Sequence, residues 1–214
     1  MDVIVPYLPA LFKGTITTLW LSVATLSLAL VVGLVVALGR LSRRRVLRTV
    51  SRAYTDLIRG TPALIQIFYI YFGLPQLGIN IDAIPAGIIA LGMNSGAYMG
   101  EIFRAGIQSI DPGQMEAARS AGMSHRQAMQ VAILPQVVRR VIPPLTGEAT
   151  SLVKGTSLLS VISIGELTRV GQQIVGVTFR PLEAFAAIGL TYLVINVALS
   201  QLSVMLERRL AFPQ

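Results

Sequence analysis

The sequence predicts an all-α, polytopic membrane protein, and three observations lead to this prediction. First, 53% of the 214 residues are hydrophobic and only 13% are charged, whereas soluble domains carry about 25% charged residues. Second, 14–39 and 184–206 contain no charge, and only Asp82 interrupts 60–100. Third, most of the 18 lysines and arginines gather between these stretches. Since about 20 apolar residues cross a bilayer as a helix, the stretches are long enough to span it.

Three spans are predicted in the first half of the chain. The stretch 14–39 is longer than the apolar region of about 7 to 15 residues in a cleavable signal sequence, so we expect a retained helix. Pro62 and Pro75 limit the second helix, which should start near residue 61 and end between residues 74 and 78. The third span covers 83–100.

Two more spans are predicted in the second half. The fourth lies within 141–165, a region with two prolines and the charged residues Glu148 and Lys154, which is otherwise rich in leucine, valine and isoleucine. We interpret it as a polar-lined span. The fifth, 184–206, has no charged residue.

The positions of the basic residues predict the orientation. Five spans put the termini on opposite sides of the membrane. With the N-terminus outside and the C-terminus inside, the cytoplasmic segments 40–59, 101–140 and 207–214 hold 7, 5 and 2 basic residues, or 14 of the 18. Positive residues accumulate in cytoplasmic loops, so we expect this orientation. It accounts for the net charge of +8, and nucleic-acid binding by the arginine run at 43–52 is the weaker alternative.

The central segment 101–140 is much longer than a connection between two spans needs to be. Asp111, Pro112 and Gln114 have the pattern of an N-cap, a proline at the first helical position and a capping-box partner. They predict a short helix that ends near Ala121.

A second helix should follow a bend in this segment. Gly122 is suited to a helix C-terminus with positive φ, Ser124 and Gln127 form a second capping-box pattern, and Pro135 is placed to end the helix. A DNA-binding helix-turn-helix is disfavoured because such a recognition helix needs a free face and a surrounding core. An ordinary amphipathic loop is the other alternative.

The residues of this segment resemble a known motif in identity and spacing. The matching positions are Glu116, Ala117, Ala118, Gly122, Leu134 and Pro135. They resemble the EAA loop of the inner-membrane permease subunits of ABC importers, in the family that carries polar amino acids and opines. Stretches at 58–62, 94–98 and 103–106 support the resemblance, which extends over most of the chain. It implies one permease domain, 1–214, with 101–140 as its coupling loop.

This resemblance implies a transport subunit of a bacterial inner-membrane importer and no enzymatic activity on this chain. The sequence has no glycine-rich phosphate-binding loop of the G-x-x-x-x-G-K-[ST] type, so ATP and Mg²⁺ are expected on a partner. The implied partners are two copies of an ABC ATPase, a second permease subunit that is identical or paralogous, an extracytoplasmic solute-binding protein and the lipid bilayer, with no nucleic acid. In the loop, Glu116 would supply a polar contact to the ATPase, Ala117 and Ala118 would allow close approach, and Gly122 would make the bend.

The resemblance also implies substrate contacts. It associates Arg59 with the carboxylate of an amino acid and Glu148 with its ammonium group, while Thr61 and Asn94 would add hydrogen bonds. The alternatives are a cytoplasmic anchor for Arg59 and a packing role for Glu148. Charged residues inside a membrane are costly and tend to be functional.

One departure from the family predicts the class of substrate. Permeases for basic amino acids commonly have an acidic residue after the lysine equivalent to Lys154, and here that position is Gly155. A buried cation without a counter-charge is costly. We therefore expect a neutral polar or acidic amino acid, with Lys154 and Gly155 near its side chain.

Two further features complete the sequence analysis. Glycines at 92, 96 and 100 form a stripe on the third span that allows another helix to approach closely, from this chain or from a second subunit. With no cysteine and one histidine, His125, the sequence supports no metal or cofactor site and no nucleophilic catalysis. The alternative function is an ion or small-solute channel without an ATPase, which would leave the central segment unexplained.

Overall fold

The computed structural model describes residues 4–210, with side chains up to residue 205, and every regular element in that range is a helix. The all-α prediction is thus confirmed. The elements are η1 (Val5–Tyr7), α1 (Leu8–Leu41), α2 (Arg45–Arg59), α3 (Ala63–Phe68), η2 (Tyr69–Gly73), α4 (Leu74–Gln76), α5 (Ala83–Gln108), α6 (Pro112–Ser120), α7 (His125–Ala128), η3 (Met129–Ile133), α8 (Leu134–Gly155), η4 (Thr156–Ile162), α9 (Leu167–Thr178) and α10 (Pro181–Leu210).

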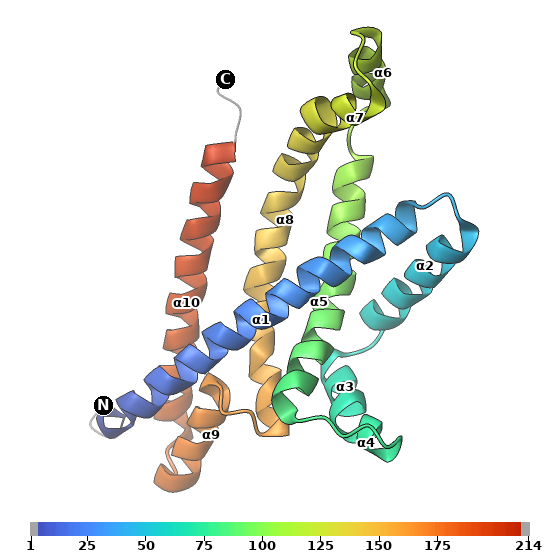
Figure 1. Cartoon of the computed structure of the whole chain (residues 1–214). Coiled ribbons are helices and arrows are strands. Elements are labelled where there is room, and N and C mark those ends of the chain that lie inside the picture. Colours follow the sequence, from blue (N-terminus) through green and yellow to red (C-terminus); the bar gives the residue numbers. More distant parts are fainter. Residues whose placement is uncertain (1–3, 211–214) are drawn as a thin grey trace.

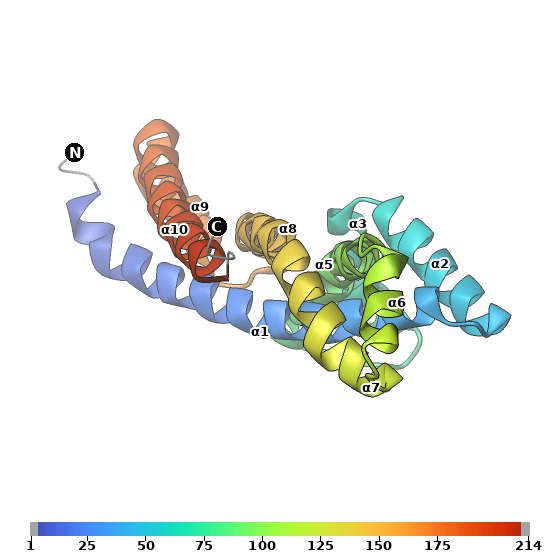
Figure 2. The ribbon, with the colours of Figure 1, turned by 90° about the horizontal axis from the view of Figure 1, so that it is seen from above.

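The long helices form a bundle with two distinct ends. In Figure 1, α5, α8 and α10 stand upright while α1 crosses them obliquely. Seen from above, α1 runs along one side of the row formed by α10, α8 and α5 (Figure 2). The central segment with α6 and α7 projects from one end, called here the loop end, and α3, α4 and α9 lie at the far end. The first described residues lie near the far end, and α10 ends toward the loop end.

The glycine stripe of α5 packs against α1 of the same chain, a partner that the sequence left open. The side chain of Leu28 packs on Gly92, that of Val32 on Gly96 and that of Val36 on Gly100. A Cβ built on Gly96 would lie 2.6 Å from Cγ1 of Val32. From the other side, a Cβ on Gly33 would lie 2.8 Å from Cβ of Met99 and 3.1 Å from the backbone nitrogen of Gly100. We call this close contact the glycine seam.

The second predicted span is a short helical segment that follows a sharp bend. Most of the segment 40–59 forms α2, for which the sequence analysis proposed no structure. The chain then turns at Gly60 to Pro62, and α2 makes an angle of 106° with the helical stretch Ala63–Gln76. Pro62 precedes the first residue of α3 and Gly78, with φ of +83°, follows α4. The helical segment thus starts and ends where the prolines predicted, near residue 61 and between residues 74 and 78.

The prediction that Pro135 ends the second loop helix is wrong. Helical structure continues from His125 to Gly155, and Pro135 lies in the first turn of α8. Proline lacks an amide hydrogen and its ring crowds the carbonyl four residues earlier. Here the five residues before Leu134 form a π-helical turn, η3, whose wider geometry accommodates the proline within a continuing helix.

The third and fourth spans also differ in extent from the prediction. α5 continues beyond residue 100 to Gln108. α8 begins at Leu134 and ends at Gly155, after which a 3-10 segment leads to Ser163 in the left-handed conformation. The region 141–165 therefore holds the end of one helix, a 3-10 turn and part of a loop. The polar-lined fourth span predicted within 141–165 thus corresponds mainly to the second half of α8, which ends at Gly155.

The central segment has the predicted helix, glycine, helix order, with one capping detail corrected. The Asp111 carboxylate accepts a hydrogen bond from the amide of Gly113 at the start of α6, but Gln114 does not complete a capping box. Its side-chain oxygen instead accepts a hydrogen bond of 3.0 Å from Gln136. The second capping box, between Ser124 and Gln127, is confirmed. Gly122 has φ of +86° as expected.

Two described helices are long and apolar enough to cross a membrane, Val5–Leu41 and Pro181–Met205, and the bent pair of α2 with α3 and α4 gives a third. The other two expected spans, α5 and α8, contain 26 and 22 residues. They are less apolar because α5 holds the glycine stripe and α8 holds four charged residues. The count of five spans thus stays a prediction.

Candidate functional site

The break between α2 and α3 is bridged by a buried glutamine that the sequence analysis did not identify. Carbonyl groups at the end of a helix have no partner within that helix. The Gln66 side-chain nitrogen donates hydrogen bonds to the carbonyls of Ile58, at 2.7 Å, and Thr61, at 3.1 Å. It also lies 2.8 Å from the Thr61 hydroxyl oxygen. Gln66 thereby holds the two sides of the break together.

The same glutamine joins the break to α5. Its side-chain oxygen accepts a hydrogen bond of 3.0 Å from the Asn94 amide nitrogen. Nearby, the Tyr54 hydroxyl of α2 donates a hydrogen bond of 2.6 Å to the Met93 carbonyl. Two predicted site residues, Thr61 and Asn94, thus belong to one polar network with Gln66 at its centre. A glutamine four positions after Pro62, within an otherwise apolar predicted span, was the available signal in the sequence.

Arg59 and Glu148 bring opposite charges from two different helices to the stretch of α5 that also holds Asn94. The Arg59 guanidinium lies 5.0 Å from the ring centroid of Tyr98 on α5, in cation–π geometry. The Glu148 carboxyl on α8 interacts with the hydroxyl of Ser95 on α5 and with the charge of Arg59. The two charges form no direct ion pair among the described side chains. Each therefore keeps hydrogen-bonding capacity for a ligand.

Of the six predicted substrate residues, four converge and two lie apart. Arg59, Thr61, Asn94 and Glu148 gather around the middle of α5 through the contacts above. Lys154 is exposed and stands six residues beyond Glu148, about 9 Å along α8. A Cβ added to Gly155 would meet no atom within 4 Å. No described contact joins these two residues to the other four, and no ion pair between Lys154 and Glu148 is found among the described side chains.

The predicted coupling residues divide into exposed and buried ones. Glu116, Ala117, Gly122 and Pro135 are exposed, and Leu134 is 45% exposed. Ala118, by contrast, is buried within the loop, so its small side chain permits packing inside this chain. This corrects the expectation that both alanines face a partner.

The central segment is anchored to the bundle by an apolar cluster at the loop end. The buried residues of this cluster are Ile110, Ile133, Val137 and Val141, and Met115 of α6 packs against them. α6 projects beyond the ends of the long helices (Figure 1). The exposed residues of the loop are therefore presented on a fixed support.

The far end is fastened by a second buried polar group, Glu166, which precedes α9. Its carboxylate accepts hydrogen bonds from the amides of Thr168, at 2.9 Å, and Arg169, at 2.7 Å, and from the Tyr192 hydroxyl at 2.9 Å. The next amide, that of Leu167, donates to the hydroxyl of Thr18 on α1 at 3.1 Å. Burial raises the pKa of Glu166. The carboxylate thus ties α9 to α10, in a structural role that was not predicted.

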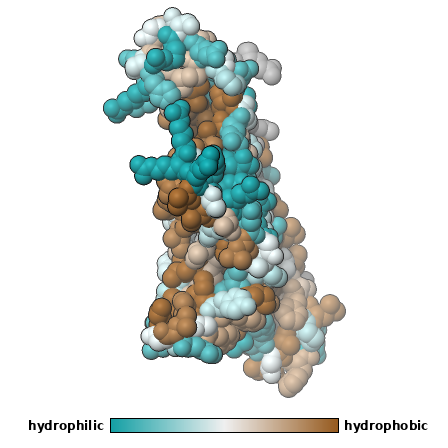
Figure 3. Space-filling model, turned by 90° about the vertical axis from the view of Figure 1, so that its right-hand side faces the viewer, coloured by the Kyte–Doolittle hydropathy of each residue, from teal (hydrophilic) through white to brown (hydrophobic). Residues whose placement is uncertain are grey.

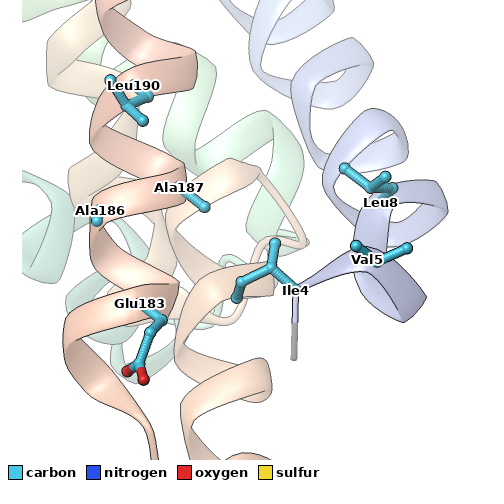
Figure 4. A pocket seen from close by; sticks show the side chains of 7 residues that line it. All are labelled: Ile4, Val5, Leu8, Glu183, Ala186, Ala187 and Leu190. Atoms are coloured by element: carbon cyan, nitrogen blue, oxygen red, sulfur yellow. The ribbon is translucent and has the colours of Figure 1, made fainter. Parts of the chain in front are cut away.

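A separate hollow between α1 and α10 is apolar (Figure 4). It has a volume of 370 Å³ and is lined by Ile4, Val5, Leu8, Glu183, Ala186, Ala187 and Leu190. Glu183 lies at one end of the hollow (Figure 4) and pairs with Arg180 at 3.3 Å. A surface of this kind suits a hydrocarbon chain better than a polar solute. The polar network on α5 is therefore the candidate solute site.

Comparisons with known proteins agree with this architecture. Residues 29–212 match the family described as binding-protein-dependent transport system inner membrane components. The chain is 39% identical over 207 residues to the glutamine transport system permease protein GlnP of Escherichia coli (strain K12), covering 96% of this chain and 94% of that protein. It is 36% identical to the arginine transport system permease protein ArtQ of Bacillus subtilis (strain 168), with the same coverage.

Solved structures show the same fold. A crystal structure described as an amino acid ABC transporter with histidines superposes with a TM-score of 0.90 at 42% identity, over 96% of both chains. An inward-facing methionine transporter, MetNI, gives a TM-score of 0.81 at 19% identity, over 97% of this chain and 99% of that chain, a likeness of fold alone. The chain therefore belongs to the family of binding-protein-dependent transport system inner membrane components, as a permease subunit of the amino-acid ABC importers.

Proposed function

We propose that this permease carries a neutral polar or acidic amino acid through a site formed by Arg59, Thr61, Asn94 and Glu148, with Gln66 positioning the network. The observation that carries the proposal is the separation of two opposite charges around a shared amide and hydroxyl network. An amino acid presents the complementary pair, a carboxylate and an ammonium group. Hydrogen bonds between charged groups are stronger than neutral ones, so both ends of the substrate gain specific contacts.

Charge-removing variants test this site in proteoliposomes that contain the assembled transporter. Arg59→Gln and Glu148→Gln should each reduce amino-acid uptake on the order of tenfold or more, because each replaces a hydrogen bond between opposite charges with a weaker one from a neutral amide. Arg180→Gln and Glu183→Gln are matched controls, since this exposed pair lies away from the network. Normal uptake by both site variants would contradict the proposed site.

The substrate class rests on the open space beside Gly155. Relatives are named for glutamine, arginine and cystine transport, so the family includes neutral and basic substrates. We propose that Lys154 and the space at Gly155 accept an uncharged or acidic side chain. ATPase stimulation by a panel of amino acids should be strongest for neutral polar or acidic substrates. Strong stimulation by arginine or lysine, with none by glutamine, glutamate or cystine, would refute this part of the proposal.

A gain-of-function variant sharpens the same test. Gly155→Asp places a carboxylate where a Cβ meets no neighbouring atom, so it should increase stimulation by arginine and lysine relative to wild type. Gly176→Asp adds the same charge at an equally open position on α9 and should leave selectivity unchanged.

We propose five membrane spans, with the N-terminus outside and residues 1–214 as one permease domain. Asn80 and Gln172 are exposed toward the far end, and Ser124 is exposed at the loop end. Cysteines introduced at Asn80 and Gln172 should react with an impermeant thiol reagent added from outside. Cysteines at Ser42 and Ser124 should react only after the membrane is permeabilised. The opposite labelling pattern would show that the N-terminus lies inside and would contradict the proposed topology.

Coupling to ATP hydrolysis is proposed for the exposed residues Glu116, Ala117, Gly122, Leu134 and Pro135 of the central segment. The assembly would contain two permease subunits, identical or paralogous, and two ATPases, together with a solute-binding protein on the outside. One set of five spans is too small to enclose a path with two alternating gates. Mass measurement of the detergent-solubilised complex checks this stoichiometry, and a permease that functions as a single copy would contradict it.

Gly122→Asp tests the coupling role. Both Asn and Asp tolerate the left-handed conformation better than other residues, so Gly122→Asn is a control of nearly equal shape without charge. Gly122→Asp should insert normally but lose solute-stimulated ATP hydrolysis, because it adds a carboxylate to the exposed bend. If Gly122→Asp reached wild-type abundance in the membrane and kept normal solute-stimulated ATP hydrolysis, the proposed coupling role of the bend would be contradicted.

A further inference from the structure

A charged pocket lies at the loop end, apart from the proposed solute site. It has a volume of 420 Å³ and is formed where the last turns of α1 and α5 meet the first half of α2. Its lining residues are Arg40, Arg48, Thr49, Arg52, Arg104 and Gln108. Four guanidinium groups therefore surround one polar hollow.

The positive charge of this pocket is only partly balanced. Arg40 and Arg104 share one carboxylate, Glu101, at 2.6 and 2.7 Å. Arg52 contacts Asp56 at 3.5 Å, with both side chains largely exposed, and water screens exposed pairs of this kind. Arg48 forms no ion pair among the described side chains. Four cations and two carboxylates leave an excess positive charge that favours a bound anion.

The helix that supplies two of these arginines has an uncovered apolar face. Val46, Val50 and Leu57 are 73%, 63% and 65% exposed. Their spacing of four and seven residues places them on one stripe of α2. Arg48 and Arg52 lie on the opposite face, whereas Tyr54 is hydrogen-bonded to Met93 of α5 and Thr55 is buried. α2 thus presents hydrocarbon on one side and basic groups on another.

A helix with a basic face and an apolar face matches the boundary between lipid headgroups and acyl chains. Figure 3 views the side of the bundle that carries α2, and hydrophilic side chains gather in its upper half above a mainly hydrophobic lower half. Under the proposed topology the pocket faces the cytoplasmic leaflet, where anionic lipids attract basic segments. A soluble anion would satisfy the arginines but would leave the apolar stripe in water.

We propose that this pocket binds the phosphate of an anionic phospholipid, whose acyl chains lie along the stripe Val46, Val50 and Leu57. Arg48 and Arg52 contact the headgroup directly. Arg40 and Arg104, oriented by Glu101, form the floor of the pocket. The proposal goes beyond solute transport and does not depend on which solute is carried.

The test compares two double variants of the full chain in its assembled, delipidated complex, titrated with phosphatidylglycerol and followed by native mass spectrometry. Arg48→Gln with Arg52→Gln should weaken binding on the order of tenfold or more, because each basic residue near an anionic surface contributes about 1 kcal/mol. Arg43→Gln with Arg44→Gln removes the same charge from exposed positions outside the pocket and should bind like wild type. Phosphatidylcholine should bind both variants and the wild type equally.

Further measurements separate the sources of the phosphate and the other occupants of this face. Inorganic phosphate and glycerol phosphate should not displace the bound lipid, and displacement by either would assign the pocket to a soluble anion. If phosphatidylglycerol binding weakened equally in both double variants, the net positive charge of the region would explain the binding and the pocket would not. Failure of phosphatidylglycerol to bind the wild-type complex would mean that a protein subunit covers the stripe. Each of these results overturns the proposal, and normal membrane abundance of both variants controls for misfolding.

Discussion

Glycine serves different purposes in the glycine seam and in the central segment. At the seam, Gly33 and Gly96 lie in regular helices, and they are required because side-chain and backbone atoms of the neighbouring helix stand where a Cβ would be. At the loop, Gly122 has open space around its Cβ position but a φ of +86°. The first requirement comes from tertiary packing and the second from local backbone geometry.

The two regions should therefore follow opposite substitution rules. A position limited by space should tolerate no added atom, whatever the preferred backbone conformation of the new residue. A position limited by φ should tolerate residues that adopt the left-handed conformation and reject β-branched ones.

Gly33→Ala should produce the largest loss of stability. Its Cβ would lie 2.8 Å from Cβ of Met99 and 3.2 Å from the Gly96 carbonyl, so α1 and α5 must separate. Overpacking of this kind costs about 1 to 3 kcal/mol, and thermal unfolding in detergent measures it. Gly189→Ala on α10 meets no atom within 4 Å and should be neutral or slightly stabilising. Equal melting temperatures for the two variants would show that the seam is not tightly packed.

Gly122→Val should have an intermediate effect that is confined to the loop. A non-glycine residue in the left-handed region costs roughly 1 to 2 kcal/mol, and a β-branched side chain adds to the strain. Hydrogen exchange of the amides in α6 and α7 should accelerate, while exchange in α1 and α5 stays unchanged. Gly122→Asn should exchange like wild type. If Val and Asn behave alike, positive φ is not what requires glycine here.

Gln114→Ala should have the smallest effect. It removes the 3.0 Å hydrogen bond between exposed side chains that joins α6 to Gln136 of α8. Exposed interactions of this kind usually change stability by no more than about 0.5 kcal/mol. The global melting temperature should therefore stay unchanged, while amide exchange in α6 rises slightly. A large drop in the melting temperature would show that α6 belongs to the same cooperative unit as the seam.

The same contrast explains how much of the fold could be predicted. The ends of the loop helices depend on residues within a few positions of each other, so Asp111, Ser124 and Gly122 were predicted to take these roles. The partner of the glycine stripe depends on residues about sixty positions away and could not be predicted. Pro135 failed as a stop signal because a π-helical turn precedes it, a distortion that the local sequence does not specify.

The candidate site was predictable to a similar degree. The resemblance to the family pointed to Arg59, Thr61, Asn94 and Glu148, which the structure brings together. Gln66 escaped notice because its importance lies in carbonyls that only the 106° bend exposes. Lys154 and Gly155 were predicted to lie near the side chain of the substrate, but no described contact joins them to the other four residues, and Lys154 lies about 9 Å along α8 from Glu148.

The π-helical turn at Met129–Ile133 also sets which way α8 faces. It accommodates one residue more than an α-helical turn would hold, and each residue of an α-helix corresponds to a rotation of about 100°. Deleting Ala132 would allow the turn to close into an ordinary helix and would rotate everything beyond it, including Glu148, by about that angle relative to the loop. The orientation of the carboxylate in the bundle is therefore tied to the length of a turn more than ten residues away.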